Sequence, residues 1–276
     1  MIWAAFRNIC FKALTFGFIS CLDLDDKVQH GQYSMIKLMM KSAYFGSLTF
    51  IFFVVLTLST ARADIQQYEF DVHIRGIKAG QLRYAIDTQE RGYSIHGVLE
   101  STGILGILVR YKFDAHALGR KADNKFQPSY YKEVSDTGRR KSDKIIEYME
   151  GVPNVISKKQ PKPHWVDAST QKGTLDPMTA MAALLSDRKK NHLCQLYLPM
   201  FDGSRRVDII AQDKNKTDKG VRCSGIYKRI DGFTEKEWAD GDHFPFTIKY
   251  EFDGEIFWVS KFEIKTRHGR ASFIRR

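Results

Sequence analysis

The chain has 276 residues, with 43 Lys and Arg against 32 Asp and Glu, so its formal net charge at pH 7 is +11. This length allows a real hydrophobic core and does not require two domains. The basic surplus fits either a solvated surface or attraction to anionic envelope material such as lipid head groups, while the export signal described next argues against nucleic acid as a partner.

Residues 35–63 have the anatomy of a secretory signal peptide. Lys37 and Lys41 form a basic start, residues 42–61 carry no charge, and Ala61-Arg62-Ala63 has the small residues of a cleavage site. We therefore expect cleavage between Ala63 and Asp64 and a mature protein released into the periplasm.

Residues 1–34 precede this signal, and we expect them to come from a misplaced start codon, with the true start at Met35, Met39 or Met40. The alternative is a true extension followed by an inner-membrane anchor, because residues 42–61 match the ~20 uncharged residues that span a bilayer. The next cysteine after this apolar run is Cys194, so no site for lipid attachment follows the signal.

The mature region covers residues 64–276, and its first half is predicted to be an antiparallel meander. From Tyr68 to Ile74 apolar residues alternate with polar ones, as in a strand with one buried and one wet face. Residues 76–80 supply a turn with two glycines. Further strands are predicted over residues 82–86, 93–97, 111–118, 126–134 and 144–149.

One apolar segment interrupts this pattern. Residues 101–109 contain two glycines and lack alternation, so they form either a buried crossover or a mobile flap near a ligand or a membrane. The candidate residues for such apolar contacts are Ile104, Leu105, Ile107 and Leu108.

A proline-rich loop or linker over residues 157–174 precedes one principal helix. Asp176 is a good N-cap, Pro177 suits the first helical position, and apolar residues then recur at helical spacing. Basic residues 188–190 would complement the dipole of the last turn, so we predict a helix over about 177–190. Its stripe of Met, Ala and Leu is typical of core packing.

Strands resume after this helix, and two Asp-Gly pairs, Asp202-Gly203 and Asp253-Gly254, predict hairpin turns. The predicted strands cover residues 194–200, 206–211, 221–227, 246–252, 256–266 and 271–274. The fold class is therefore mainly β: a single domain with an antiparallel curved sheet or open β-barrel-like meander and one principal helix.

Cys194 and Cys223 are the two cysteines of the mature region, and in an oxidising compartment an isolated pair indicates a disulfide. Free thiols and a metal site are the alternatives, but neither cysteine has a second cysteine or a set of histidines at ligand spacing.

The sequence contains no recognisable catalytic pattern. It lacks H-E-x-x-H, G-x-S-x-G and P-loop motifs, and its histidines are scattered. We therefore assign no catalytic, cofactor-binding or metal-binding residue and expect no cofactor. Whether the protein is an enzyme stays open, with a non-enzymatic role favoured.

The order of several short motifs resembles the bacterial exported family of unknown function called DUF3108, over about residues 66–276. The motifs are Tyr68-x-Phe70-x-Val72, Gly76 and Gly80, Gly103 to Gly106, Pro128-x-Tyr130, Asp176-Pro177, Cys194, Phe201-Asp202-Gly203-x-Arg205-Arg206, Cys223-x-Gly225-x-Tyr227, Gly232-Phe233 and Gly269. The resemblance implies an exported, β-rich protein and no particular reaction.

Three functions are compatible with this sequence. The first is a periplasmic protein that binds an apolar or amphiphilic envelope ligand, such as a lipid, because aromatic residues are frequent and one segment is strongly apolar. The second is a structural or interaction protein of the envelope without a small ligand, and the third is an envelope hydrolase with an unrecognised site. The oligomeric state is left open.

Overall fold

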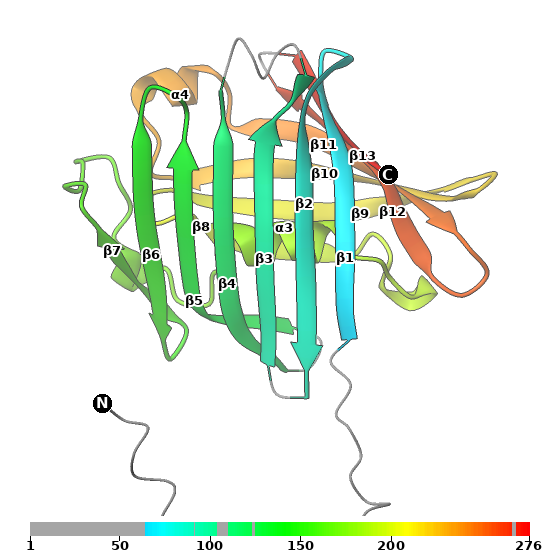
Figure 1. Ribbon diagram of the computed structural model, residues 1–276, viewed down its shortest axis with the longest axis horizontal. Helices are drawn as coiled ribbons and strands as arrows, with labels where there is room; N and C mark the ends of the chain where they lie inside the picture. Colours follow the sequence, from blue (N-terminus) through cyan, green and yellow to red (C-terminus); the bar gives the residue numbers. More distant parts are fainter. Residues whose placement is uncertain (1–63, 91, 104–109, 123–124, 267–268) are drawn as a thin grey trace, which may run out of the picture. The chain divides into compact units, whose positions relative to one another are not determined.

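The computed structural model describes residues 64–90, 92–103, 110–122, 125–266 and 269–276 (Figure 1). The predicted signal peptide and leader, and the four apolar residues Ile104, Leu105, Ile107 and Leu108, lie outside the described residues.

Thirteen antiparallel strands form one sheet. In chain order the strands are β1 (Asp64–Ile74), β2 (Ile77–Gln89), β3 (Gly92–Ser101), β4 (Lys112–Ala122), β5 (Lys125–Asp136), β6 (Lys141–Met149), β7 (Val152–Ser157), β8 (Leu196–Phe201), β9 (Arg206–Thr217), β10 (Gly220–Asp231), β11 (His243–Phe252), β12 (Phe257–Thr266) and β13 (Gly269–Arg275). Their spatial order is β7-β6-β5-β4-β3-β2-β1-β13-β12-β11-β10-β9-β8, so the first and last strands meet in the middle. The predicted mainly β fold class is confirmed.

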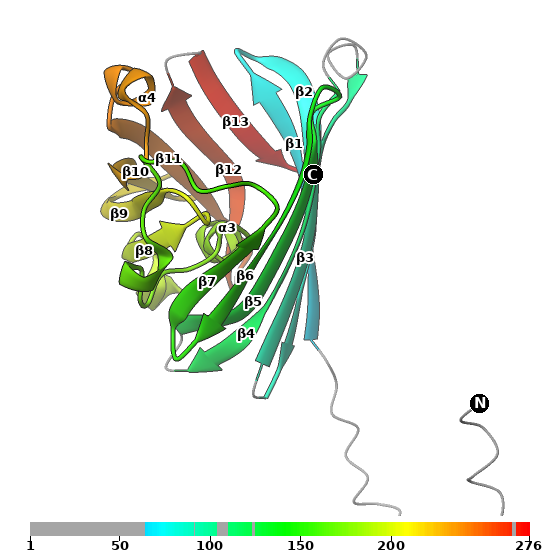
Figure 2. The same cartoon turned by 90° about the vertical axis from the view of Figure 1, so that its left-hand side faces the viewer.

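The sheet bends so strongly that β3–β6 lie opposite β8–β11, with a helix between these two halves (Figure 2). It is not closed into a barrel, because its edge strands β7 and β8 do not pair with each other. Part of the predicted linker crosses this opening. The Gly173 N–H donates to the Gly151 carbonyl at 2.8 Å, and the Leu175 N–H donates to the Pro199 carbonyl of β8 at 2.7 Å.

Side chains that alternate between the two faces of each strand explain which residues form the interior. In β1, Tyr68 and Phe70 are buried, while Glu69 and Asp71 on the opposite face are partly exposed. The predicted turn at 76–80 is too long, since β2 already begins at Ile77. Gly80 lies within this strand, and a Cβ added there would come 2.4 Å from the Glu100 carbonyl oxygen of β3. Its glycine reflects close approach of two strands and not a turn.

The principal helix, α3 (Pro177–Leu185), is shorter than predicted. Asp176 caps it as expected, but Ser186 is already extended, so residues 188–190 are not in its last turn. The Arg188 N–H instead donates to the Phe257 carbonyl at 2.8 Å, while its guanidinium donates to the Ala183 carbonyl near the helix end. A basic side chain thus reaches the helix C-terminus from outside the helix.

β7 and a second α-helix were not predicted from the sequence. β7 contains Pro153, which a strand tolerates at a sheet edge. A short helix, α4 (Glu235–Ala239), begins with a capping box between Thr234 and Glu237. No helix of the described residues combines the length and the apolar character that crossing a bilayer requires.

A disulfide joins Cys194 and Cys223, as predicted. Cys194 lies just before edge strand β8, and Cys223 lies in β10, so the bond spans the intervening strand β9. It therefore ties the second edge of the sheet to its neighbours.

Candidate functional site

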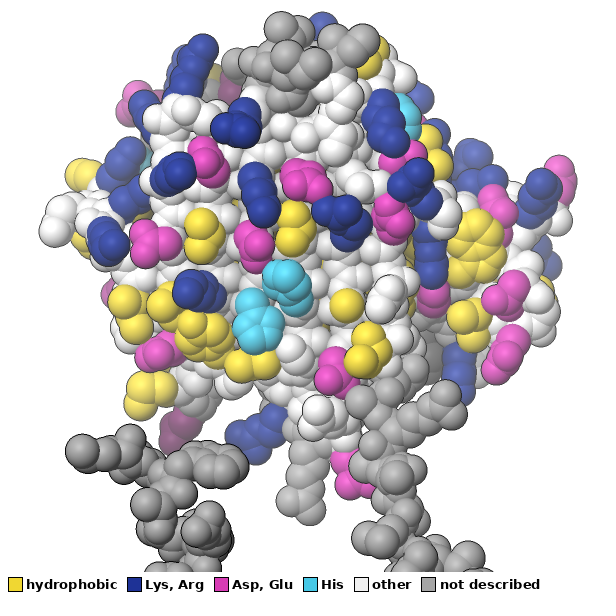
Figure 3. All heavy atoms as spheres, in the orientation of Figure 1, with side chains coloured by type: hydrophobic (Ala, Val, Ile, Leu, Met, Phe, Trp, Pro, Cys, Tyr) yellow, Lys and Arg dark blue, Asp and Glu magenta, His cyan; other side chains and the backbone are white. Residues whose placement is uncertain are grey.

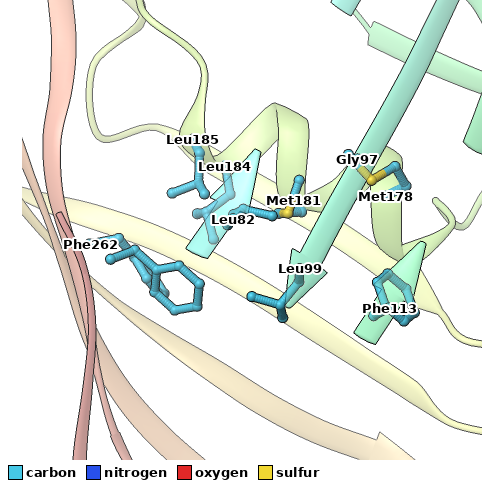
Figure 4. A pocket seen from close by; sticks show the side chains of 10 residues that line it. Leu82, Gly97, Leu99, Phe113, Met178, Met181, Leu184, Leu185 and Phe262 are labelled. Atoms are coloured by element: carbon cyan, nitrogen blue, oxygen red, sulfur yellow. The ribbon is translucent and has the colours of Figure 1, made fainter. Parts of the chain in front are cut away.

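A wholly apolar cavity of about 150 Å³ lies between α3 and the facing parts of the sheet. No polar side chain lines it (Figure 4). The lining residues are Leu82, Gly97, Leu99, Phe113, Met178, Met181, Leu184, Leu185, Phe262 and Phe273. They come from β2, β3 and β4, from the helix, and from β12 and β13 near the end of the chain.

Gly97 allows the helix to approach β3 closely. A Cβ on this residue would lie 2.6 Å from the Cε atom and 2.9 Å from the Sδ atom of Met178. Any larger residue at position 97 would therefore push the Met178 side chain away from β3. Because thioether side chains are flexible, Met178 and Met181 give one wall of the cavity the capacity to adjust its shape.

The N-terminus of α3 is held by a buried polar network. Asp176 is fully buried, and its carboxylate accepts hydrogen bonds from the Thr179 N–H at 2.9 Å and the Thr179 hydroxyl at 2.6 Å. Since the Thr179 hydroxyl gives its proton to Asp176, the Tyr93 hydroxyl 3.1 Å away is the donor to Thr179. Burial raises the pKa of Asp176 to about 6, although the Thr179 hydrogen bonds oppose this shift.

The C-terminus of α3 is held by β2, β12 and β13. The Tyr84 hydroxyl donates to the Leu185 carbonyl at 3.1 Å. The Asp187 carboxylate pairs with the Arg275 guanidinium at 2.5 Å and accepts the Val259 N–H at 3.1 Å. Both ends of α3, which borders the cavity, are thus fixed to strands of the sheet.

Residues that flank the predicted apolar segment lie beside this cavity. Leu99 and Phe113, two residues outside Ser101 and Tyr111, line the cavity wall. The Ser101 N–H donates to the Tyr111 carbonyl at 2.8 Å, and the Tyr111 N–H donates to the Ser101 hydroxyl at 2.9 Å. These bonds bring the two ends of the connection between β3 and β4 together.

Sequence reasoning did not identify the cavity as a site. It placed Met178, Met181 and Leu185 in the core, but it gave no role to Leu99, Phe113 or the C-terminal phenylalanines. The one available signal was Gly97 within an otherwise regular strand, since glycine there indicates a close approach.

Polar side chains gather elsewhere, on the outer face of β3 and β4. The Ser94 hydroxyl and the His116 Nε2 atom lie 3.0 Å apart, while His96 Nε2 lies 3.0 Å from Asp114. Burial, and secondarily the neighbouring His96, lowers the pKa of His116. Because serine and aspartate contact different histidines, these residues do not form a Ser-His-Asp relay. No group of three potential metal ligands occurs in the part of the chain that the structure describes.

No curated protein matches the sequence. The crystal structure of a beta-barrel-like protein of the domain of unknown function DUF1849 from Brucella abortus is similar at 13% identity, covering 79% of this chain and 98% of that chain, with a TM-score of 0.46.

A comparison with protein families matches residues 69–261 to the family described as "Protein of unknown function (DUF3108)". The matched range includes twelve of the thirteen strands in whole or part, α3, and every cavity residue except Phe262 and Phe273. Because the match extends over well more than half of the 276 residues, the chain belongs to the DUF3108 family.

Proposed function

We propose that this protein binds the hydrocarbon part of an amphiphilic envelope molecule in the cavity beneath α3, without catalysing a reaction. The observation that carries this proposal is the lining of ten apolar residues with no polar side chain among them. Such a surface offers nothing for acid–base or nucleophilic chemistry, but it removes alkyl groups from water.

The volume of the cavity limits what enters it. Sites for drug-sized ligands have about 300–1,000 Å³, whereas an apolar cavity near 150 Å³ accepts a six-carbon ring. The cavity therefore suits the end of an alkyl chain, with the remainder of the molecule outside. Each buried methylene contributes about 0.8 kcal/mol, so a short chain end alone gives weak binding.

Export to the periplasm is part of this proposal. The signal-like residues 35–63 motivate it, and the disulfide between Cys194 and Cys223 supports an oxidising compartment. Protein purified from a periplasmic fraction should have an intact mass that begins at Asp64. A mass that includes residues 42–61 would instead favour the membrane-anchored alternative.

Alkyl binding can be measured with uncharged probes, so that attraction to the basic protein does not contribute to the measured affinity. The mature region has four methionines, so ¹³C-methyl labelling gives four resolved reporters: Met178 and Met181 at the cavity, Met149, which is 73% exposed, and Met200. Titration with 1-alkanols of four to ten carbons should shift the Met178 and Met181 methyl signals and leave Met149 unchanged. Affinity should rise about fourfold per methylene and then level off when the cavity is full.

A matched pair of variants tests the location. Leu99→Trp places an indole in the cavity wall, whereas Leu118→Trp places one on the outer face of β4, where Leu118 is 37% exposed. The first variant should lose alkanol binding while keeping its β-sheet circular dichroism, and the second should bind normally. Unchanged binding in Leu99→Trp, or no response to any alkanol, would reject the proposal and favour an envelope protein without a small ligand.

A further inference from the structure

The outer face of β3–β6, opposite to the cavity, carries an open groove of about 520 Å³. Two histidines lie side by side on this face, among basic and acidic side chains (Figure 3). The groove residues are His96, Lys112, Asp114, His116, Lys132, Val134, Asp136 and Lys141. Because strands alternate their side chains, this set shares no residue with the cavity.

The two histidines form the centre of the groove. His96 of β3 and His116 of β4 are direct cross-strand partners, and their ring centroids lie 6.5 Å apart. Ser94 contacts His116, and Asp114 contacts His96, each at 3.0 Å. The strand on the other side of His116 presents Lys132 directly opposite it.

Two of the three groove lysines supply positive charge that no ion pair of the described residues neutralises. Lys141 lies 3.4 Å from Asp136, but Lys112 and Lys132 are exposed and form no ion pair within the described ranges. Nearby acidic residues are already engaged, since Glu100 pairs with Arg83 and Asp143 approaches Lys158. The groove thus combines three lysines with two aspartates, a surplus of one positive charge.

We propose that this groove binds a phosphate group, either free or as the head group of an anionic lipid. Lys112 and Lys132 attract the anion from two neighbouring strands. When His116 is protonated, its Nε2–H donates to the Ser94 oxygen, which leaves the Ser94 hydroxyl proton and the His116 Nδ1–H as donors for the anion. Because burial lowers the pKa of His116, its added charge comes only as the pH falls below 6.5, and there the binding of an anion whose own charge is constant should tighten. The site is independent of the alkyl cavity.

Two probes separate the sources of the phosphate. Inorganic phosphate is titrated at pH 8 while the imidazole signals of His96 and His116 are followed by NMR, with chloride at equal ionic strength as the reference. Vesicles of phosphatidylcholine with 30% phosphatidylglycerol are tested by co-sedimentation at pH 5 and pH 8, with pure phosphatidylcholine as the reference. A response only to vesicles identifies a lipid head group, and a response only to inorganic phosphate identifies a soluble phosphate; each supports the groove.

Charge-matched variants decide whether the groove is responsible. The double variant Lys112→Gln/Lys132→Gln should weaken binding about 25-fold, since each lysine contributes roughly fivefold. The control, Lys214→Gln/Lys216→Gln, removes the same charge from exposed positions of β9 and should bind like the parent protein. Equal losses in both variants, no loss in the groove variant, or no response to either probe would overturn the proposal. Leu99→Trp should leave groove binding intact, so failure of the cavity and failure of the groove are distinguishable.

Discussion

The pKa of a side chain in this protein, and its effect on stability, depend on where the side chain is buried. Asp176 is the clearest case, because its carboxylate caps α3 from a fully buried position. The groups that face it from the sheet include Tyr93, Tyr131 and Tyr148, whose own pKa values are raised by burial and, in smaller part, by this carboxylate. Its partners are therefore polar but uncharged at neutral pH.

The pH dependence of unfolding should reveal this carboxyl group. The pKa of Asp176 is about 6 in the folded protein and near 3.8 when exposed, so the folded state binds the proton more tightly. Stability contributed by this group is therefore lowest above pH 6 and rises as the pH falls towards 4, by at most ~3 kcal/mol.

Asp176→Asn isolates that contribution, because asparagine remains a good N-cap and does not titrate. Urea unfolding at pH 7.5, 6 and 4.5 should show the parent protein gaining stability relative to Asp176→Asn as the pH falls. Taking the difference between the two proteins cancels the opposite effect of His116, whose lowered pKa costs stability in acid. A difference that does not change with pH would show that Asp176 titrates normally.

At the scale of elements, the sequence predicted most strands and the start of α3, because these depend on neighbouring residues. The alternation of apolar and polar residues predicted β1, and the Asp176-Pro177 pair predicted the start of the helix. The helix end depended on distant contacts instead. Asp187 leaves the helix to pair with Arg275, 88 residues later, so helical spacing alone predicted too long a helix.

Loss of this distant contact should loosen α3. Asp187→Ala leaves the Arg275 guanidinium and the Val259 N–H without their shared partner, and both side chains of the pair are about one-fifth exposed or less. We expect a loss of ~1–3 kcal/mol in the free energy of unfolding. Lys261→Ala, which breaks the more exposed pair with Glu263, should cost under ~1 kcal/mol. Equal effects in the two variants would contradict an anchoring role for Asp187.

At the scale of the whole molecule, the cavity could not be predicted because it is a non-local product of folding. Leu82, Met178 and Phe273 meet only after the sheet has bent and β13 has paired with β1. Each of these residues, considered alone, is an ordinary core residue, and only their imperfect packing leaves a space. The groove has the same origin, since cross-strand register sets the His96–His116 pair.

The disulfide should stabilise the molecule unevenly. Its residues are 29 apart, so removing it by Cys194→Ala/Cys223→Ala should lower the free energy of unfolding by ~2–4 kcal/mol. Hydrogen exchange should accelerate most in β8 and β9, which the bond ties to β10, and least in β1–β3. Uniform acceleration along the sheet would indicate that the bond acts only through the unfolded chain.

The pairing of β1 with β13 also sets an order of events during biosynthesis. When the chain is delivered from its N-terminus, the strands β1 through β7 can pair one after another as they emerge. One edge of β1 then stays unpaired. That edge is filled only by β13, more than 190 residues later, when Val72 pairs with Phe273. Until β13 emerges, the nascent protein therefore exposes an unpaired strand edge, with which other chains can pair and aggregate. A chaperone that binds unfolded chains would protect the protein at this stage.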